Sequence, residues 1–106
     1  MDRTPTAPMP TISVVIPAFN AQRTLGAVLD ALARQGPPAD EVIVVDDGSS
    51  DRTAEIAREA GARVVSPAGP GGYAGGARNA GWDAATSDVV VFLDSDAIPD
   101  DGWLDG

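Results

Sequence analysis

The sequence predicts an α/β fold with a mainly parallel sheet and helices on both faces. Short apolar runs rich in Val alternate with segments of helical periodicity, which is the pattern of βαβ units. Two of the runs end in closely spaced aspartates, and ligands of open α/β sheets bind just past the carboxyl ends of the strands. We therefore expect a ligand site at that edge of the sheet.

The chain has 106 residues, which fits one small domain. Residues 1–10 contain three prolines and no apolar period, so we expect a flexible N-terminal lead-in. Residues 11–106 then form the domain.

The first strand and helix follow the lead-in. Residues 12–16 predict a buried strand, which we expect Pro17 to stop because proline cannot donate to a ladder. Apolar residues at three- and four-residue spacing predict an amphipathic helix over 21–35. Asn20 is a candidate N-cap, and the Gly-Pro-Pro sequence at 36–38 ends the helix.

A second strand and helix repeat the pattern. Residues 42–45 predict a strand that closes on an acidic stretch, and Ser50 or Asp51 is expected to cap a helix over 52–60. Residues 63–65 predict a short third strand at the sheet edge.

The last strand follows a glycine-rich segment and a third helix. Residues 69–76 form the glycine-rich segment, and the helix is expected over 77–86. The five apolar residues 89–93 predict a strand buried on both faces. With right-handed crossovers and the first strand inside the sheet, the order is 3-2-1-4, and a crevice opens between strands one and four.

The composition excludes several functional classes. Without Cys, His or Lys, the chain has no disulfide, no His-dependent triad and no Lys-dependent phosphate loop. A net charge of −9 disfavours nucleic acid as a partner. No apolar run approaches the ~20 residues that span a bilayer, and a secretory signal is absent. We expect a cytoplasmic protein, with attachment to the cytoplasmic face of a membrane left open.

The acidic pair after the last predicted strand is the first candidate site. In extended geometry, residues i and i+2 point the same way, so Asp94 and Asp96 would present both carboxylates to one side. Two such carboxylates repel each other unless a divalent cation or a donor lies between them. A solvated turn is the alternative, because Asp is common at strand ends.

Three further residues are candidates for ligand contacts. Asp46 or Asp47, facing the crevice, could accept hydrogen bonds from a base or a ribose; the alternative is a turn with a helix cap. Arg78 suits recognition of a diphosphate or a base, and its alternative is a salt bridge within this acidic chain.

Four motifs occur along the chain: residues 12–20 (Ile-Ser-Val-Val-Ile-Pro-Ala-Phe-Asn), 42–51 (Val-Ile-Val-Val-Asp-Asp-Gly-Ser-Ser-Asp), 75–81 (Gly-Gly-Ala-Arg-Asn-Ala-Gly) and 92–97 (Phe-Leu-Asp-Ser-Asp-Ala). Together they resemble the family 2 glycosyltransferases, which have the Rossmann-like GT-A fold. Their order and spacing make the resemblance more specific than any one motif.

The resemblance implies a nucleotide-diphosphate sugar as the donor and Mg²⁺ or Mn²⁺ as the cofactor. It places the turn at 17–20 against the base, Asp47 with Asp46 at base or ribose, and Asp94 at the ribose or metal. The implied nucleotide-sugar-binding residues are Pro17, Ala18, Phe19, Asn20, Asp46, Asp47, Arg78, Asp94 and Ser95. The implied metal ligands are Asp96 and Asp94.

The resemblance also implies parts that these residues do not supply. Members of the family continue well beyond the metal motif, and the general base is expected beyond Gly106. We therefore interpret the chain as a donor-binding part, truncated at its C-terminus, with an unknown acceptor and with inversion at the sugar carbon. The alternative is a non-catalytic nucleotide-binding or interaction module, and an uncovered face could support self-association. A phosphatase of the haloacid dehalogenase type, with Asp94 as nucleophile, is disfavoured because that chemistry needs a Lys.

Overall fold

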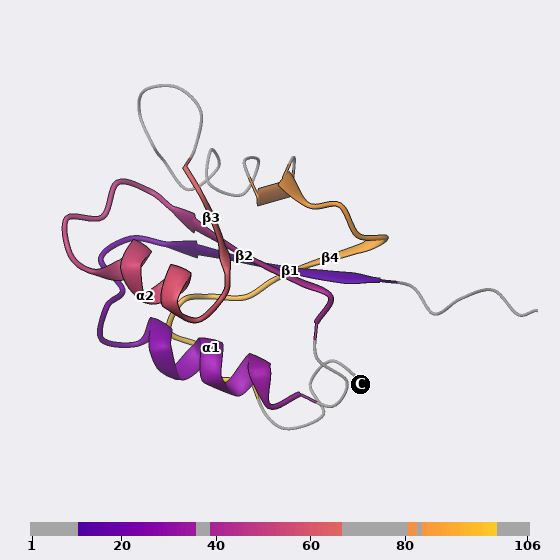
Figure 1. The fold of residues 1–106 in the computed structure, drawn as a ribbon, viewed down its shortest axis with the longest axis horizontal. Helices are drawn as coiled ribbons and strands as arrows, with labels where there is room; N and C mark the ends of the chain where they lie inside the picture. Colours follow the sequence, from indigo (N-terminus) through magenta and orange to yellow (C-terminus); the bar gives the residue numbers. More distant parts are fainter. Residues whose placement is uncertain (1–10, 36–38, 67–80, 83, 100–106) are drawn as a thin grey trace, which may run out of the picture.

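The computed structural model describes residues 11–35, 39–66, 81–82 and 84–99 of the chain. The described strands form one parallel sheet in the order β3-β2-β1-β4, which confirms the order predicted from the sequence. Figure 1 shows β1 and β2 in the middle of this sheet. The strands are β1 (Ile12–Ala18), β2 (Glu41–Asp46), β3 (Arg63–Val65) and β4 (Val89–Phe92).

Strand β1 continues past Pro17, so the prediction that this proline stops the strand is wrong. The N–H of Leu93, just after β4, donates to the carbonyl of Val15 at 3.0 Å. Since alternate residues of a strand direct their backbone groups to opposite sides, Pro17 faces the same side as Val15. Strand β4 has ended at that level, so the proline interrupts no ladder hydrogen bond there, and it pairs with Val45 of β2 in register.

The two long helices begin later than expected. Helix α1 (Leu25–Ala33) starts four residues after the predicted position, and Asn20 is not its N-cap. Asn20 has a left-handed backbone (φ 48°), and its side-chain oxygen accepts the N–H of Ser50 instead. Helix α2 (Thr53–Glu59) lies within the predicted range.

The helices cover the two faces of the sheet unequally (Figure 1). Helices α1 and α2 pack on one face over the larger apolar cluster, which includes Ile16, Val28 and Val44. The other face has a smaller cluster of Val15, Ile43 and Val45, against which Ala84 and Ala85 pack. Helical backbone therefore lies on both faces, as predicted: helices α1 and α2 on one face, and the helical residues Gly81 and Ala84 on the other.

Only the end of the predicted third helix is described. Gly81, Trp82 and Ala84 have helical backbone, and the N–H of Ala85 donates to the Gly81 carbonyl at 3.1 Å. Residues 77–80 of that helix, the glycine-rich segment 69–76, the lead-in 1–10 and residues 36–38 lie outside the described residues. A Cβ on Gly81 would overlap the Val15 side chain, so glycine permits the close approach of this segment to β1.

Strand β4 is less buried than its apolar sequence predicted. Val89 is 41% exposed and the next three residues are half-buried, because β4 has a neighbour on one side only within the described sheet. The expectation of burial on both faces is therefore wrong for this part of the chain. None of the described helices combines the length and the apolar character that crossing a bilayer requires.

Candidate functional site

The loops after β1 and β2 lie at the end of the sheet where the parallel strands finish, which we call its carboxyl edge; the opposite end, where the strands begin, is its amino edge. The two loops are hydrogen-bonded to each other. The N–H of Asn20 donates to Ser49 Oγ at 2.8 Å, and the N–H of Ser50 donates to Asn20 Oδ1 at 2.9 Å. The N–H of Asp47 donates to the Ala18 carbonyl at 2.9 Å. The left-handed backbone at Asn20 allows both groups of this residue to face the second loop.

A buried hydroxyl joins the same two loops more deeply. Thr53 is fully buried; its Oγ1 accepts the N–H of Ala21 at 2.8 Å and donates to the Asp51 carboxylate. Asp51 also accepts the N–H of Thr53 at 3.0 Å and that of Gln22 at 3.2 Å. The hydrogen bond from the Thr53 hydroxyl is the largest cause of the lowered pKa of Asp51. Asp51 is therefore an ionised structural residue of this edge.

The segment after β4 forms a turn rather than an extended strand. The N–H of Ala97 donates to the Asp94 carbonyl at 3.1 Å, and Ser95 and Asp96 lie in the turn that this bond closes. Asp94 and Asp96 therefore do not continue the strand, and the prediction that strand alternation directs both carboxylates to one side is wrong. Thr24 Oγ1 donates to the Ser95 carbonyl at 2.8 Å, which ties the turn to the start of α1.

The aspartates of this edge fall into two groups. Asp46 Oδ1 accepts the N–H of Ser49 at 3.0 Å, so Asp46 and Asp51 both stabilise the loop after β2. Three others form no hydrogen bond or ion pair through their carboxylates with another described residue. They are Asp47, which is half-buried, and the exposed Asp94 and Asp96. The unpartnered carboxylates are thus those of the first residue after β2 and of two residues within the four that follow β4.

The remaining predicted contact residues lie at the same edge, with one exception. Pro17 and Ala18 are the last two residues of β1. Phe19 and Asn20 follow them, and the Phe19 side chain is 62% exposed. Arg78 lies outside the described residues.

Two threonines of this edge were not predicted from the sequence. Thr24 and Thr53 hold the loops through side-chain hydrogen bonds to residues far along the chain. Their position next to a helix start is a sequence signal, but it predicts a helix cap rather than a bond between loops.

The donor atoms at this edge suit a hard divalent cation. No group of three or more Asp, Glu, His or Cys that could hold a metal occurs within the described ranges. Asp94 and Asp96 offer carboxylate oxygens without a protein partner in those ranges. Mg²⁺ is typically held by one or two carboxylates, with water and substrate phosphates as the other ligands. The donor set therefore fits a cation shared with a phosphate ligand.

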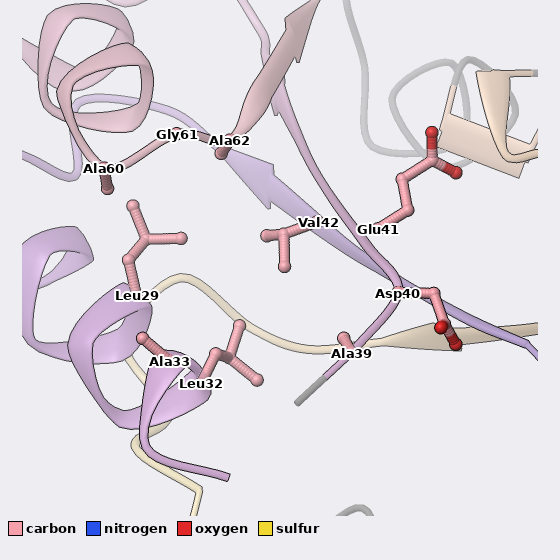
Figure 2. Close-up of a pocket in the computed structure, with 10 residues that line it drawn as sticks. All are labelled: Leu29, Leu32, Ala33, Ala39, Asp40, Glu41, Val42, Ala60, Gly61 and Ala62. Carbon is pink, nitrogen blue, oxygen red and sulfur yellow. The ribbon is translucent and has the colours of Figure 1, made fainter. Parts of the chain in front are cut away.

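A cavity of about 220 Å³ lies away from this site, at the opposite edge of the sheet. Figure 2 shows the carboxylates of Asp40 and Glu41 directed away from its apolar side chains. Its lining residues are Leu29, Leu32, Ala33, Ala39, Asp40, Glu41, Val42, Ala60, Gly61 and Ala62. The cavity lies at the amino end of β2, where an open α/β sheet does not place its ligand.

Comparison with protein families gives a match to the family described as "Glycosyl transferase family 2" over residues 13–106. Glycosyltransferase AglE of Haloferax volcanii is 35% identical over 108 aligned residues, covering 94% of this chain and 35% of that protein. Glucosyl-3-phosphoglycerate synthase of Mycolicibacterium smegmatis is 40% identical over 100 residues, covering 86% of this chain and 32% of that protein. The chain spans about a third of the length of these curated relatives.

Solved structures give the same result for the fold. Glucosyl-3-phosphoglycerate synthase of Mycobacterium tuberculosis, in complex with Mn²⁺, UDP and glucosyl-3-phosphoglycerate, matches with a TM-score of 0.70 and 41% identity. The match covers 85% of this chain and 35% of that one. TarS of S. aureus, residues 1–349, matches with a TM-score of 0.78 and 30% identity over 90% of this chain and 30% of that one. The sheet described above is thus the one seen in GT-A enzymes.

Proposed function

The chain belongs to glycosyl transferase family 2, and from this premise we propose that it is the donor-binding part of a metal-dependent glycosyltransferase. The donor is a nucleoside diphosphate sugar, and the whole protein transfers the sugar to an acceptor with inversion. One observation carries this proposal: the carboxylates of Asp47, Asp94 and Asp96 have no partner among the described residues and follow β2 and β4 at one edge.

The loops after β1 and β2 form the nucleoside side of the proposed site. Asp47 accepts hydrogen bonds from the base or the ribose, since Asp46 already accepts the N–H of Ser49. The exposed ring of Phe19, next to Asn20, offers an apolar face to the base. Uracil is the base that we propose, because the similar synthase of Mycobacterium tuberculosis is in complex with UDP and Mn²⁺.

The turn after β4 forms the diphosphate side. Asp96 and Asp94 hold Mg²⁺ or Mn²⁺ with their carboxylates, and Arg78 lies near the nucleotide. When bound, the cation supplies Lewis-acid stabilisation for the negative charge of the departing nucleoside diphosphate. Asp94 and Asp96 add two negative charges next to the diphosphate, so they favour binding of the nucleotide only when the cation is present.

Transfer with inversion needs a base that accepts the proton of the acceptor hydroxyl. We propose that this base and the acceptor site belong to the part of the relatives that the chain does not match. The alternative of a non-catalytic nucleotide-binding module gives the same donor binding without transfer, and an assay of sugar transfer by the whole protein separates the two. The expected cytoplasmic location stays a prediction.

Thermal unfolding of the 106-residue chain tests donor binding. We expect UDP at ten times its dissociation constant, with Mn²⁺ in excess, to raise the melting temperature by several degrees, since it adds about 1.4 kcal/mol. UDP with EDTA should give no shift. Asp96→Ala should abolish the shift with Mn²⁺.

Asp30→Ala is the matched control, because Asp30 is an exposed aspartate on α1 away from the site. It should keep the full shift. A wild-type chain that shows no shift with UDP or GDP in the presence of Mn²⁺ or Mg²⁺ would refute the proposal.

A further inference from the structure

Thr24 forms a hydrogen bond that helix α1 does not need. It immediately precedes α1, yet its side chain makes no capping bond to the helix. Its Oγ1 lies 2.8 Å from the Ser95 carbonyl oxygen and 3.4 Å from that of Ala21. The Ala21 carbonyl already accepts the N–H groups of Thr24 and Leu25, so the single hydroxyl proton goes to Ser95.

The carbonyl of Ser95 belongs to the peptide unit that leads into Asp96. Because a peptide unit is planar, a hydrogen bond to its oxygen also fixes the direction in which the backbone enters the next residue. The bond from Thr24 therefore restrains the Cα of Asp96 without touching its carboxylate, which is exposed.

Packing restrains the two ends of the turn but not its middle. Leu93 is 8% exposed in the cluster under α1, and Ala97 packs against the same cluster. Between them lie Asp94 and Asp96, whose like charges repel each other and favour a wider separation when no cation is bound. Among the side chains that the structure describes, Thr24 supplies the hydrogen bond that opposes this movement at Ser95.

The segment that carries Thr24 also holds the nucleoside side of the proposed site. Asn20 bonds to Ser49 and Ser50, and Ala21 bonds to Thr53, all in the stretch from the loop after β2 to the start of α2. Residues 20–24 therefore connect the loop of Asp47 with the turn of Asp96, and the chain after β4 runs beside the start of α1 (Figure 1).

We propose that Thr24 is a positioning residue for the divalent cation: its hydroxyl holds the Ser95–Asp96 peptide so that both aspartates are arranged for the ion before it binds. This inference rests on the proposed function, because the cation belongs to the same site. Without the hydroxyl, the turn must be ordered when the ion binds, and that cost lowers the affinity for the ion.

The test compares Thr24→Val, which removes the hydroxyl at nearly constant volume, with Thr24→Ser, which keeps it. Mn²⁺ is titrated into the full 106-residue chain in the presence of UDP, and free Mn²⁺ is followed by its electron paramagnetic resonance signal. We expect Thr24→Val to bind Mn²⁺ about fivefold more weakly than the wild type, the effect of one net hydrogen bond. Thr24→Ser should match the wild type within roughly twofold.

Two further measurements separate positioning from a general loss of structure. Binding of uridine, which has no diphosphate and needs no cation, should be the same in all three proteins by calorimetry at high protein concentration, since the nucleoside side is intact. Melting temperatures should show that each variant is folded at the titration temperature. If Val disturbs the start of α1, Thr24→Ala removes the same hydroxyl without bulk and should give the same loss.

The possible outcomes separate a failure of the proposed role of Thr24 from a failure of the proposed function. A wild type that binds Mn²⁺ with UDP, together with Thr24→Val and Thr24→Ala variants that bind it equally well, overturns the inference alone. A wild type that binds no Mn²⁺ with UDP overturns the proposed function and the inference with it. A loss of Mn²⁺ binding in Thr24→Ser as large as in Thr24→Val also overturns the inference, because serine keeps the donor.

Discussion

The two edges of the sheet use their acidic residues differently. At the amino edge, the carboxylates accept hydrogen bonds from the strand ends: Asp40 accepts the N–H of Ile12 at 2.7 Å, and Asp88 accepts the N–H of Thr11 at 3.1 Å. Glu41 accepts from Ser13 and Thr86. At the carboxyl edge, the carboxylates of the loop residues Asp46 and Asp51 also accept backbone N–H groups. The carboxylates of Asp47, Asp94 and Asp96 have no partner among the described residues.

This difference separates structural carboxylates from those available to a ligand. A carboxylate that accepts a backbone N–H or a buried hydroxyl stabilises the folded chain and has little left to offer a ligand. In a chain of net charge −9, an unpartnered carboxylate adds only repulsion until a cation or a donor arrives. Substitutions at the two kinds of position should therefore affect stability and binding separately.

The largest effect on stability is expected when the buried hydroxyl group of Thr53, at the carboxyl edge, is removed. Thr53→Val removes the acceptor of the buried Ala21 N–H and the donor to Asp51. An unsatisfied buried N–H and a lost charge-assisted bond should cost about 2 kcal/mol of unfolding free energy. For a domain of this size, the melting temperature should fall by roughly 10 °C, which a thermal scan measures.

Thr53→Ser is the matched control for that variant, because it keeps the hydroxyl and loses one methyl group. The loss of unfolding free energy in Thr53→Ser should be less than half of the loss in Thr53→Val. Equal losses in both variants would mean that packing of the methyl group, rather than the hydrogen bonds, holds the two loops together.

Substitution of Glu41 at the amino edge should lower the free energy of unfolding by a smaller amount, and by an amount that depends on pH. Its pKa is lowered from the ordinary value of 4.5, chiefly by the hydrogen bond from the buried hydroxyl of Ser13. A carboxylate with a lowered folded-state pKa contributes stability above its unfolded pKa and loses it as the pH falls through the folded value. Glu41→Gln should therefore cost about 1 kcal/mol at pH 7 and almost nothing well below pH 4.5.

Urea unfolding of the wild type and of Glu41→Gln at a series of pH values between neutral and acid measures that difference. Binding of UDP with Mn²⁺ at pH 7 should be unchanged, since Glu41 lies at the edge opposite to the site. A stability difference that stays constant down to acid pH would contradict the assignment of the ionised carboxylate as the group that matters.

The sequence alone predicted the sheet but not the bonds that hold the site. The alternation of strands and helices with right-handed crossovers predicted a parallel sheet, and placing the first strand inside it predicted the observed order 3-2-1-4. The bond of Thr24 to Ser95 spans 71 residues and depends on how the loops fold over the edge, which no local pattern encodes. The same holds for Asn20, whose type suits an N-cap as well as the left-handed turn that it adopts.

Two predictions were wrong although the local property of the residues was correct, because the neighbouring strands were not known. Pro17 removes a donor, as expected, but on the side where β4 has already ended. Asp94 and Asp96 follow an apolar strand, yet the strand ends at Phe92 and the aspartates lie in a turn. Both errors concern the ends of strands, because the residue types do not show where the pairing of β1 with β4 stops.

The smallest effect on stability, and the sharpest test of the comparison, is expected for the unpartnered aspartates. Replacing Asp94 and Asp96 together by Asn removes two like charges that have no partner in the described part of the chain, so stability in EDTA should change by less than about 0.5 kcal/mol and should rise if it changes. Asp88→Ala at the amino edge removes the acceptor of the Thr11 N–H and should lower stability by about 1 kcal/mol, although it removes fewer charges. Urea unfolding of the three proteins in EDTA measures both differences. A double variant that loses more stability than Asp88→Ala would mean that Asp94 and Asp96 stabilise their own turn and are not available to a cation.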